Sequence, residues 1–317
     1  MHEFKSEFAA MIRGFISLKQ SLGYSYKSEI LLLSDFDAAC ASDPARPCVL
    51  TKELAGRWIA ARSESERPGT TNHRISVMRE FARYLSLTGV ECWVPPPGLR
   101  ARGGAFACRM ITPEEAASIF AEADKFEDPS RKWLGLSASA ILRLLYSTGM
   151  RPGEAVGLRM GDVDLGSGTA RIIESKGHKD RVIALGSDIA GLLGNYSRAL
   201  ESCPGRSFFF YDGGGDPRSR IEPRRIGSVL RRLCHSAGIK PPMPRAYDFR
   251  HAFITIRILE WHRQGADLRA RLPFLSAYAG HSSIQDTMYY FRLAPGLLPA
   301  LPAGSAAEGR DHGQGIG

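Results

Sequence analysis

Residues 148–155 read Thr-Gly-Met-Arg-Pro-Gly-Glu-Ala, and an apolar stripe runs directly into them. The stripe consists of residues at helical spacing: Leu134, Ala138, Ile141, Leu142 and Leu145. This pattern predicts a buried helix, and Gly149 is placed to end it because glycine adopts the left-handed backbone of a helix C-terminus without steric strain. The sequence therefore presents Arg151 just past the end of a helix.

Two later stretches add groups that suit phosphate chemistry. Residues 247–251 read Tyr-Asp-Phe-Arg-His and supply Arg250. Residues 279–290 read Ala-Gly-His-Ser-Ser-Ile-Gln-Asp-Thr-Met-Tyr-Tyr and supply His281 and, nine positions later, Tyr290. A phosphodiester resists attack because its charge repels nucleophiles and its alkoxide leaves poorly. An enzyme without a metal therefore needs fixed cations around the phosphate.

Two arginines, a histidine and a late tyrosine, in that order, suit attack by a tyrosine on a DNA phosphodiester. Arg151 and Arg250 would clamp the phosphate, since a guanidinium binds two oxygens and keeps its charge. We predict Tyr290 as the nucleophile, because two nearby arginines favour its phenolate. His281 can donate to the phosphate or take the phenol proton.

This ordered set resembles the active site of the tyrosine recombinases, the phage-integrase family, and residues 148–164 resemble its first signature box. The resemblance implies a 3′-phosphotyrosyl intermediate and a free 5′ hydroxyl, with rejoining that needs no ATP. It also implies that Lys176, within residues 174–181, is the β-hairpin lysine that protonates the leaving oxygen, with Lys179 as a nearby alternative. We expect Glu154 to orient Arg151.

One position departs from the family pattern. Tyr247 stands where the family usually has histidine; a phenol can donate a hydrogen bond but shuttles protons poorly near neutrality. We expect the neighbouring His251 to pack locally rather than replace the missing ring. Tyr289 is the rival nucleophile, but adjacent helical residues point about 100° apart, and the nine-residue spacing favours Tyr290.

Composition sets the broad class of the protein. A chain of 317 residues suggests two domains, and its net charge of +9 with a pI of about 9.4 favours a polyanionic partner, nucleic acid by default. No run approaches the roughly 18 apolar residues of a membrane span, and we expect no signal peptide. The six cysteines lack zinc-ligand spacing and are typical of a reducing cytosol, so we predict no metal and no disulfide. We also predict no cofactor. We expect a cytoplasmic, bacterial-type, nucleoid-associated protein.

The periodicities predict a mainly α fold with a small β-sheet (α+β). Residues 1–94 indicate four helices: one carrying the apolar face Phe8, Met11, Ile12, Phe15 and Leu18, one from about Ser28, one capped by Thr51 and one beginning at Thr71. By resemblance they form a helical core-binding domain. Residues 95–98, Pro-Pro-Pro-Gly, begin a linker over 95–110.

We predict a catalytic domain over residues 111–294 and a flexible tail over 295–317. Thr112 and Glu115 form a capping box at its start. Residues 169–174 and 181–185 suggest a hairpin, residues 208–211 a further strand, and residues 224–238, 247–264 and 283–292 helices.

Five arginines are predicted to contact DNA. Arg74, Arg79 and Arg83 form a stripe on the polar side of the fourth helix, and Arg100 and Arg102 follow in the linker. A basic stripe of this kind suits a phosphate backbone.

The resemblance further implies two domains that close around double-stranded DNA at specific core sites. It also implies a homotetramer on two duplexes that exchanges C-terminal segments, to which Leu297, Leu298 and Leu301 could contribute. Accessory proteins are compatible with this reading. The function implied is a site-specific DNA recombinase for integration, excision or transposition of a mobile element, and residues 271–281 resemble transposon-borne members. Two alternatives stay open: a catalytically silent DNA-binding accessory member, favoured by Tyr247, and a type IB topoisomerase-like relaxing enzyme.

Overall fold

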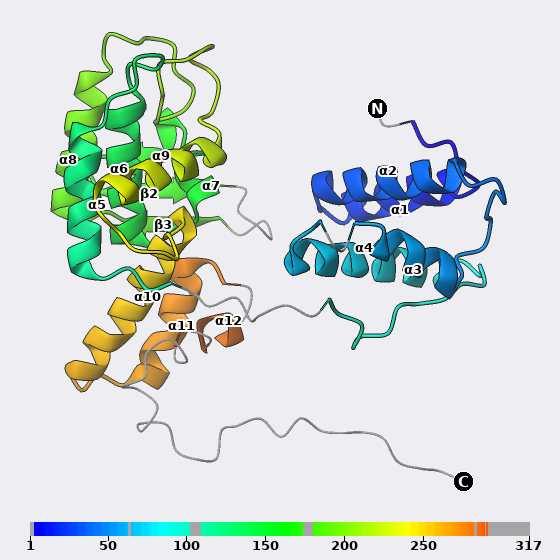
Figure 1. The fold of residues 1–317 in the computed structure, drawn as a ribbon. Helices are drawn as coiled ribbons and strands as arrows, with labels where there is room; N and C mark the ends of the chain where they lie inside the picture. The colour runs from blue at the N-terminus through cyan, green and yellow to red at the C-terminus, as the bar shows by residue number, and fades with distance from the viewer. Residues whose placement is uncertain are drawn as a thin grey trace. The chain divides into compact units, whose positions relative to one another are not determined.

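The structure of the protein is a computed structural model that describes residues 3–62, 65–101, 109–173, 180–281, 284–288 and 290. These residues form helices and one small sheet, which confirms the predicted α+β class (Figure 1). The chain divides into two compact units, Met1–Phe106 and Ala107–Gly317, and the division falls inside the stretch 95–110 that was predicted as a linker. None of the described helices is long and apolar enough to cross a membrane.

The described residues of the first unit form four helices: α1 (Ala9–Ser21), α2 (Lys27–Ala41), α3 (Lys52–Ala60) and α4 (Pro68–Leu87). Its core is rich in aromatic rings, and Phe8, Phe36 and Phe81 contact one another with ring centroids 5.4–6.4 Å apart. Such tilted and edge-on contacts add stability beyond the apolar area that they bury.

Local capping chemistry explains where some of these helices begin. The predicted cap at Thr51 is confirmed, since its Oγ1 accepts a hydrogen bond from the Leu54 N–H at 3.1 Å. The predicted start of the fourth helix at Thr71 is wrong: the helix begins at Pro68, whose fixed φ suits the first helical position. Leu18 was also misplaced, because its side chain is 44% exposed and lies outside the core.

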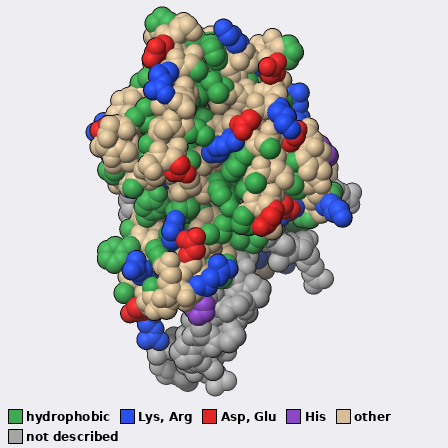
Figure 2. Space-filling view, turned by 90° about the vertical axis from the view of Figure 1, so that its left-hand side faces the viewer, with side chains coloured by type: hydrophobic (Ala, Val, Ile, Leu, Met, Phe, Trp, Pro, Cys, Tyr) green, Lys and Arg blue, Asp and Glu red, His purple; other side chains and the backbone are tan. Residues whose placement is uncertain are grey.

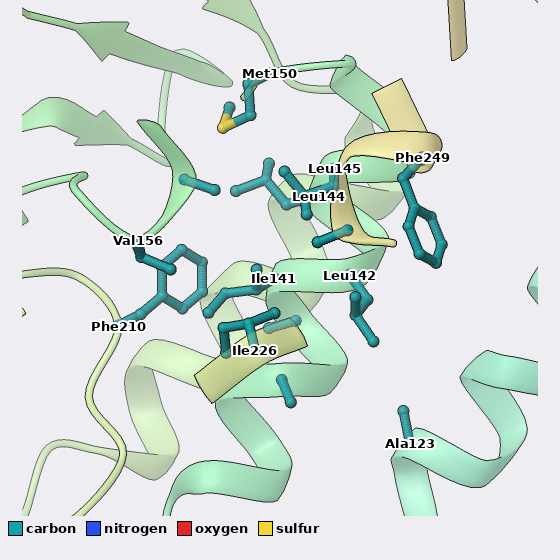
Figure 3. Packing of buried hydrophobic residues seen from close by; sticks show 14 of the residues in the cluster. Ala123, Ile141, Leu142, Leu144, Leu145, Met150, Val156, Phe210, Ile226 and Phe249 are labelled. Atoms are coloured by element: carbon teal, nitrogen blue, oxygen red, sulfur yellow. The ribbon is translucent and has the colours of Figure 1, made fainter. Parts of the chain in front are cut away.

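The second unit is organised around α6 (Leu134–Thr148). Residues 137–142 are all buried, so other elements cover this stretch of the helix on every side. It packs against α5 (Pro113–Lys125), α8 (Ser187–Ala199), α9 (Pro223–Ser236) and α10 (Ala246–Arg263). Figure 3 shows Ile141, Leu144 and Leu145 among residues from the surrounding elements. This packing gives the residues that follow α6 a rigid support.

Three strands form an antiparallel sheet in the order β1 (Val163–Asp164), β2 (Thr169–Ile172) and β3 (Arg181–Ala184). The β2–β3 pair confirms the predicted hairpin, with Ala170 opposite Ile183. Residues 208–211 do not form a strand: Phe208 makes one isolated bridge with Arg159, and Phe209 and Phe210 pack into the core instead. β1 and the short 3₁₀ helix Met160–Asp162 before it were not predicted.

The remaining helices complete the unit: α7 (Pro152–Ala155), α11 (Leu268–Ala279) and α12 (Ile284–Met288). The predicted capping box at the start of α5 is confirmed, as is the end of α6 at Gly149, where φ is 63°. Within the predicted helix 283–292 the structure describes α12 and, two residues after its end, Tyr290, while residues 283, 289, 291 and 292 lie outside the described residues. Figure 1 shows α12 beside α11, and α11 in turn packs against α10.

Candidate active site

Arg151 lies in the turn between α6 and α7, and Glu154 holds it from two sides. The Arg151 Nη1 donates to Glu154 Oε1 at 2.8 Å, and the Arg151 backbone N–H donates to Glu154 Oε2 at 2.8 Å. The proline at the first position of α7 leaves no competing N–H there. These contacts fit the orienting role expected of Glu154.

Arg250 projects from the first turns of α10 and is fully buried. Its Nη1 donates to the Gly149 carbonyl at 2.8 Å, and its Nη2 donates to the Ala279 carbonyl at 2.7 Å. Burial lowers the pKa of this guanidinium, and the nearby charge of Arg151 also lowers it. An arginine side chain nevertheless stays charged in a protein, so Arg250 supplies a fixed buried cation.

Three arginines converge on the C-terminal end of α11, immediately before His281. Consecutive carbonyls accept one hydrogen bond each: that of Tyr278 from Arg181 Nε at 2.9 Å, that of Ala279 from Arg250, and that of Gly280 from Arg151 Nη2 at 2.5 Å. The last carbonyls of a helix lack partners within the helix and carry partial negative charge. The cations therefore stabilise this helix end while it holds them in place.

Arg181, the first residue of β3, belongs to this cluster and was missed in the sequence. Its Nη2 and Nη1 donate to Glu154 Oε2 and Oε1 at 2.7 and 3.1 Å. Burial alone would raise the pKa of Glu154, but hydrogen bonds from Arg181 and Arg151 outweigh it and leave the pKa lowered. One feature could have shown its role. Arg181 and Ile183 lie two positions apart on one strand and so share a face, and Ile183 is buried, so a charge on that face needs a partner.

His281 and Tyr290 lie face to face. Their rings stack at 15° with centroids 5.9 Å apart, and His281 Nδ1 lies 2.7 Å from Thr287 Oγ1. Burial, followed by the charge of Arg250, lowers the pKa of His281 to about 4, so its ring is neutral near pH 7. Tyr290 itself is 3% exposed.

His251 does more than pack locally, which corrects the expectation from the sequence. Its Nδ1 lies 3.1 Å from Tyr290 Oη, and the two ring centroids are 5.4 Å apart. His251 and Tyr290 are 39 positions apart in the chain, so no local pattern could have shown this contact.

Tyr247 stands at the mouth of the site. It is 39% exposed, and its ring meets that of His251 edge-on at 5.0 Å. It also lines a cavity of about 970 Å³, and among the residues that the structure describes the cavity wall carries four arginines: Arg151, Arg159, Arg171 and Arg220. Lys176 and Tyr289 lie outside the described residues, as does Arg102.

The predicted basic stripe on α4 is wrong for Arg74, which the structure buries, whereas DNA binding by Arg79 and Arg83 stays a prediction. Arg74 is 1% exposed, donates to the Trp58 carbonyl at 2.6 Å and pairs with Glu66 at 3.3 Å. Arg79 is half-buried and donates to the carbonyls of residues 95, 96 and 99. Arg83 and Arg100 are exposed. Helical periodicity placed all three α4 arginines on the polar side, but it cannot distinguish a solvated arginine from one that ties neighbouring segments together.

Figure 2 shows the side of the molecule that carries α8. Basic and acidic side chains are interspersed there with apolar ones among the residues that are drawn in colour. This face therefore does not present the single-sign field that would attract a polyanion. In contrast, arginine dominates the charged lining of the cavity at Tyr247.

Comparisons with known proteins identify relatives of the whole chain. A model of the phage integrase family matches residues 109–296. The putative integrase/recombinase y4rE of Sinorhizobium fredii (strain NBRC 101917 / NGR234) is 26% identical over 307 residues, which cover 90% of this chain and 92% of the relative. The fold is similar to that of the Tn1549 transposon integrase in complex with transposon right end DNA, with a TM-score of 0.63, 14% identity and coverage of 92% and 99%. It is also similar to the lambda integrase tetramer bound to a Holliday junction, with a TM-score of 0.61, 16% identity and coverage of 89% and 76%.

Proposed function

The chain belongs to the phage integrase family, and from that premise we propose how this tyrosine-type site-specific recombinase cuts and rejoins DNA. Tyr290 attacks the scissile phosphodiester, while Arg151 and Arg250 bind its oxygens. The observation that carries the proposal is the convergence of Arg151, Arg250, His281 and Tyr290 around the C-terminal end of α11.

Arg151 and Arg250 lower the free-energy barrier of the step in which the Tyr290 oxygen bonds to phosphorus. Arg250 is buried and Arg151 is half-buried, so both act in surroundings of lower effective dielectric than water, where a fixed charge is worth more to a transition state. Both guanidiniums are already oriented by carbonyl groups and Glu154, so little reorganisation is needed when the phosphate arrives. A preorganised donor of this kind contributes roughly 10²–10³ in rate.

His281 supplies a neutral donor beside the nucleophile. If the Thr287 hydroxyl donates to Nδ1, the ring proton resides on Nε2 and can be donated to a non-bridging oxygen. The product is a 3′-phosphotyrosyl ester with a free 5′ hydroxyl. Attack by a 5′ hydroxyl on that ester rejoins the strand and releases Tyr290, and the ester conserves the energy of the broken bond. Family resemblance assigns protonation of the leaving oxygen to Lys176.

The substrate is double-stranded DNA, and recombination serves integration, excision or transposition of a mobile element. Similarity to a transposon integrase bound to a transposon end and to an integrase tetramer on a Holliday junction supports this assignment. We infer that four copies assemble on two duplexes at core sites, in the cytoplasm and in association with the nucleoid. Neither a silent accessory role nor a relaxing enzyme is favoured by these comparisons.

Formation of a covalent adduct tests the reaction class. The full chain is incubated in metal-free buffer with nicked duplexes that carry the flanks of its own gene, and protein–DNA adducts are resolved on denaturing gels. We expect an adduct that Tyr290→Phe abolishes and the matched control Tyr289→Phe retains. Loss in Tyr289→Phe alone would move the nucleophile by one residue, and specific binding by the wild-type chain without an adduct would contradict catalysis.

A further inference from the structure

Removal of the Tyr290 proton needs an acceptor. At position 247, where the family usually has a histidine, this chain has a tyrosine. Tyr247 is a poor proton acceptor near neutral pH. The ring of His281 is stacked nearly parallel to that of Tyr290, and its Nδ1 contacts Thr287 Oγ1. His251 directs a ring nitrogen at the Tyr290 oxygen.

We propose that His251 is the general base that takes the proton from Tyr290 during DNA cleavage. The inference rests on the proposed function and adds a catalytic residue to it. His251 Nδ1 lies 3.1 Å from Tyr290 Oη, within the range for direct proton transfer. As the Tyr290 oxygen bonds to phosphorus, its proton passes to Nδ1. The bond to the 5′ oxygen breaks, and that oxygen takes a proton from a separate acid. In the reverse step His251 returns the proton to Tyr290.

The surroundings of His251 keep it ready to accept a proton. The side chain is 8% exposed, and burial lowers the pKa of its ring. The neighbouring charges act in both directions: Asp248 raises this pKa, whereas Arg245 and Arg250 lower it. The ring is thus neutral near pH 7, and Asp248 offsets part of the repulsion when it becomes an imidazolium.

Tyr247 has a separate, positioning role in this arrangement. It precedes His251 by one turn of α10, and its ring meets that of His251 edge-on at 5.0 Å. This contact restricts rotation of the imidazole, and the exposed side of the phenol faces the cavity that Arg151 also lines. Tyr247 thus supplies the hydrogen-bond donor and His251 the proton acceptor, and both lie on one face of α10.

The test measures the rate of adduct formation on a nicked duplex as a function of pH. His251→Gln keeps a polar side chain of similar size but cannot take a proton. We expect this variant to react 10²–10⁴-fold more slowly at pH 7, the usual contribution of a general base. Its rate should then rise by about tenfold per pH unit through neutrality, because hydroxide replaces the base, whereas the wild-type rate should be flat there. His262→Gln, which changes an exposed histidine on the same helix, is the matched control and should behave as wild type.

Two further measurements separate a missing base from a misfolded site. Added imidazole should restore the rate of His251→Ala but not that of Tyr290→Phe. A duplex with a bridging 5′ sulfur, whose leaving group needs no acid, should leave the His251→Gln defect unchanged. Binding of the intact duplex reports whether each variant folds.

The outcomes distinguish this inference from the function on which it rests. A His251→Gln variant with wild-type rate and pH profile, beside an inactive Tyr290→Phe, would overturn the base assignment and leave the recombinase intact. Rescue of His251→Gln by the sulfur substrate would overturn it as well, because His251 would then serve the leaving group. The absence of any Tyr290-dependent adduct from the wild-type chain would remove both.

Discussion

Replacing Arg181 by methionine should destabilise the second unit and displace Arg151. Arg181 is 9% exposed in its side chain, and it makes two hydrogen bonds to Glu154 and one to the Tyr278 carbonyl. Removing one partner of a buried ion pair costs about 3–5 kcal/mol, because the other charge is left without compensation. Glu154 would keep its bonds from Arg151, so we expect the lower end, about 3 kcal/mol.

Urea unfolding of the full chain measures this loss, and a second arginine of the same unit provides the control. Arg218 pairs with Asp216, but the two side chains are 74% and 45% exposed. Exposed pairs of this kind contribute at most about 1 kcal/mol, so Arg218→Met should change the free energy of unfolding by less than that amount. Arg181→Lys should fall between the two, because a single ammonium nitrogen cannot reach the three acceptors that the guanidinium nitrogens contact.

The pH dependence of the Arg181→Met effect carries a definite sign. The pKa of Glu154 is lowered in the folded protein from its ordinary value of 4.5, so its ionised form contributes stability above that pH. This contribution is lost as the pH falls through the folded-state pKa, and the gap between wild type and Arg181→Met should narrow there. The variant should also form the adduct about 10²-fold more slowly at neutral pH, since Arg151 loses a rigid support.

Two results would refute this reasoning. One is an Arg181→Met variant as stable as Arg218→Met, which would mean that the cluster around Glu154 is not coupled. The other is a stability gap that does not change with pH, which would mean that the ionised Glu154 carboxylate is not the partner that matters.

Three other predictions concern residues of both units. Arg74→Met should lower the free energy of unfolding of the first unit by about 3 kcal/mol, as a urea titration would show. Arg83→Ala should change that free energy by less than about 0.5 kcal/mol, but a binding titration should show a lower DNA affinity with a weaker salt dependence. His281 should stay neutral when folded, so the protein should lose about 2–3 kcal/mol as the pH falls from 6.5 to 4, and His281→Asn should abolish that part of the acid loss. Gly149→Ala should destabilise the second unit by at least 1 kcal/mol, because φ is 63° and the added Cβ would collide with Phe253, as a lowered melting temperature would reveal.

Features set by neighbouring residues could be predicted from the sequence. The caps at Thr51 and Thr112 and the helix end at Gly149 depend on residues within one turn, and all three are present in the structure. α8 and α11 were missed for the same local reason. α8 contains Gly191 and Gly194, and α11 contains Pro273, so their local propensities argue against helices that tertiary packing stabilises.

Long-range contacts within the site could not be predicted in this way. The motifs named Arg151 and Arg250, but Arg181 enters the site only because β3 runs past the end of α11. The contact between His251 and Tyr290 likewise depends on how α10 packs against the segment beyond α12. The prediction for Arg74 was wrong because amphipathic spacing is the same for two cases. It fits an arginine that contacts DNA, and it fits a buried arginine that binds Trp58, as Arg74 does.

Mapping the covalent adduct tests the central claim most directly. After reaction with a nicked duplex, nuclease and trypsin digestion should leave the peptide of residues 272–292 with a nucleotide attached, and fragmentation should place it on one of two adjacent tyrosines. Our account predicts a 3′-phosphate ester on Tyr290. A nucleotide on Tyr289, on another residue or on no peptide at all would contradict it.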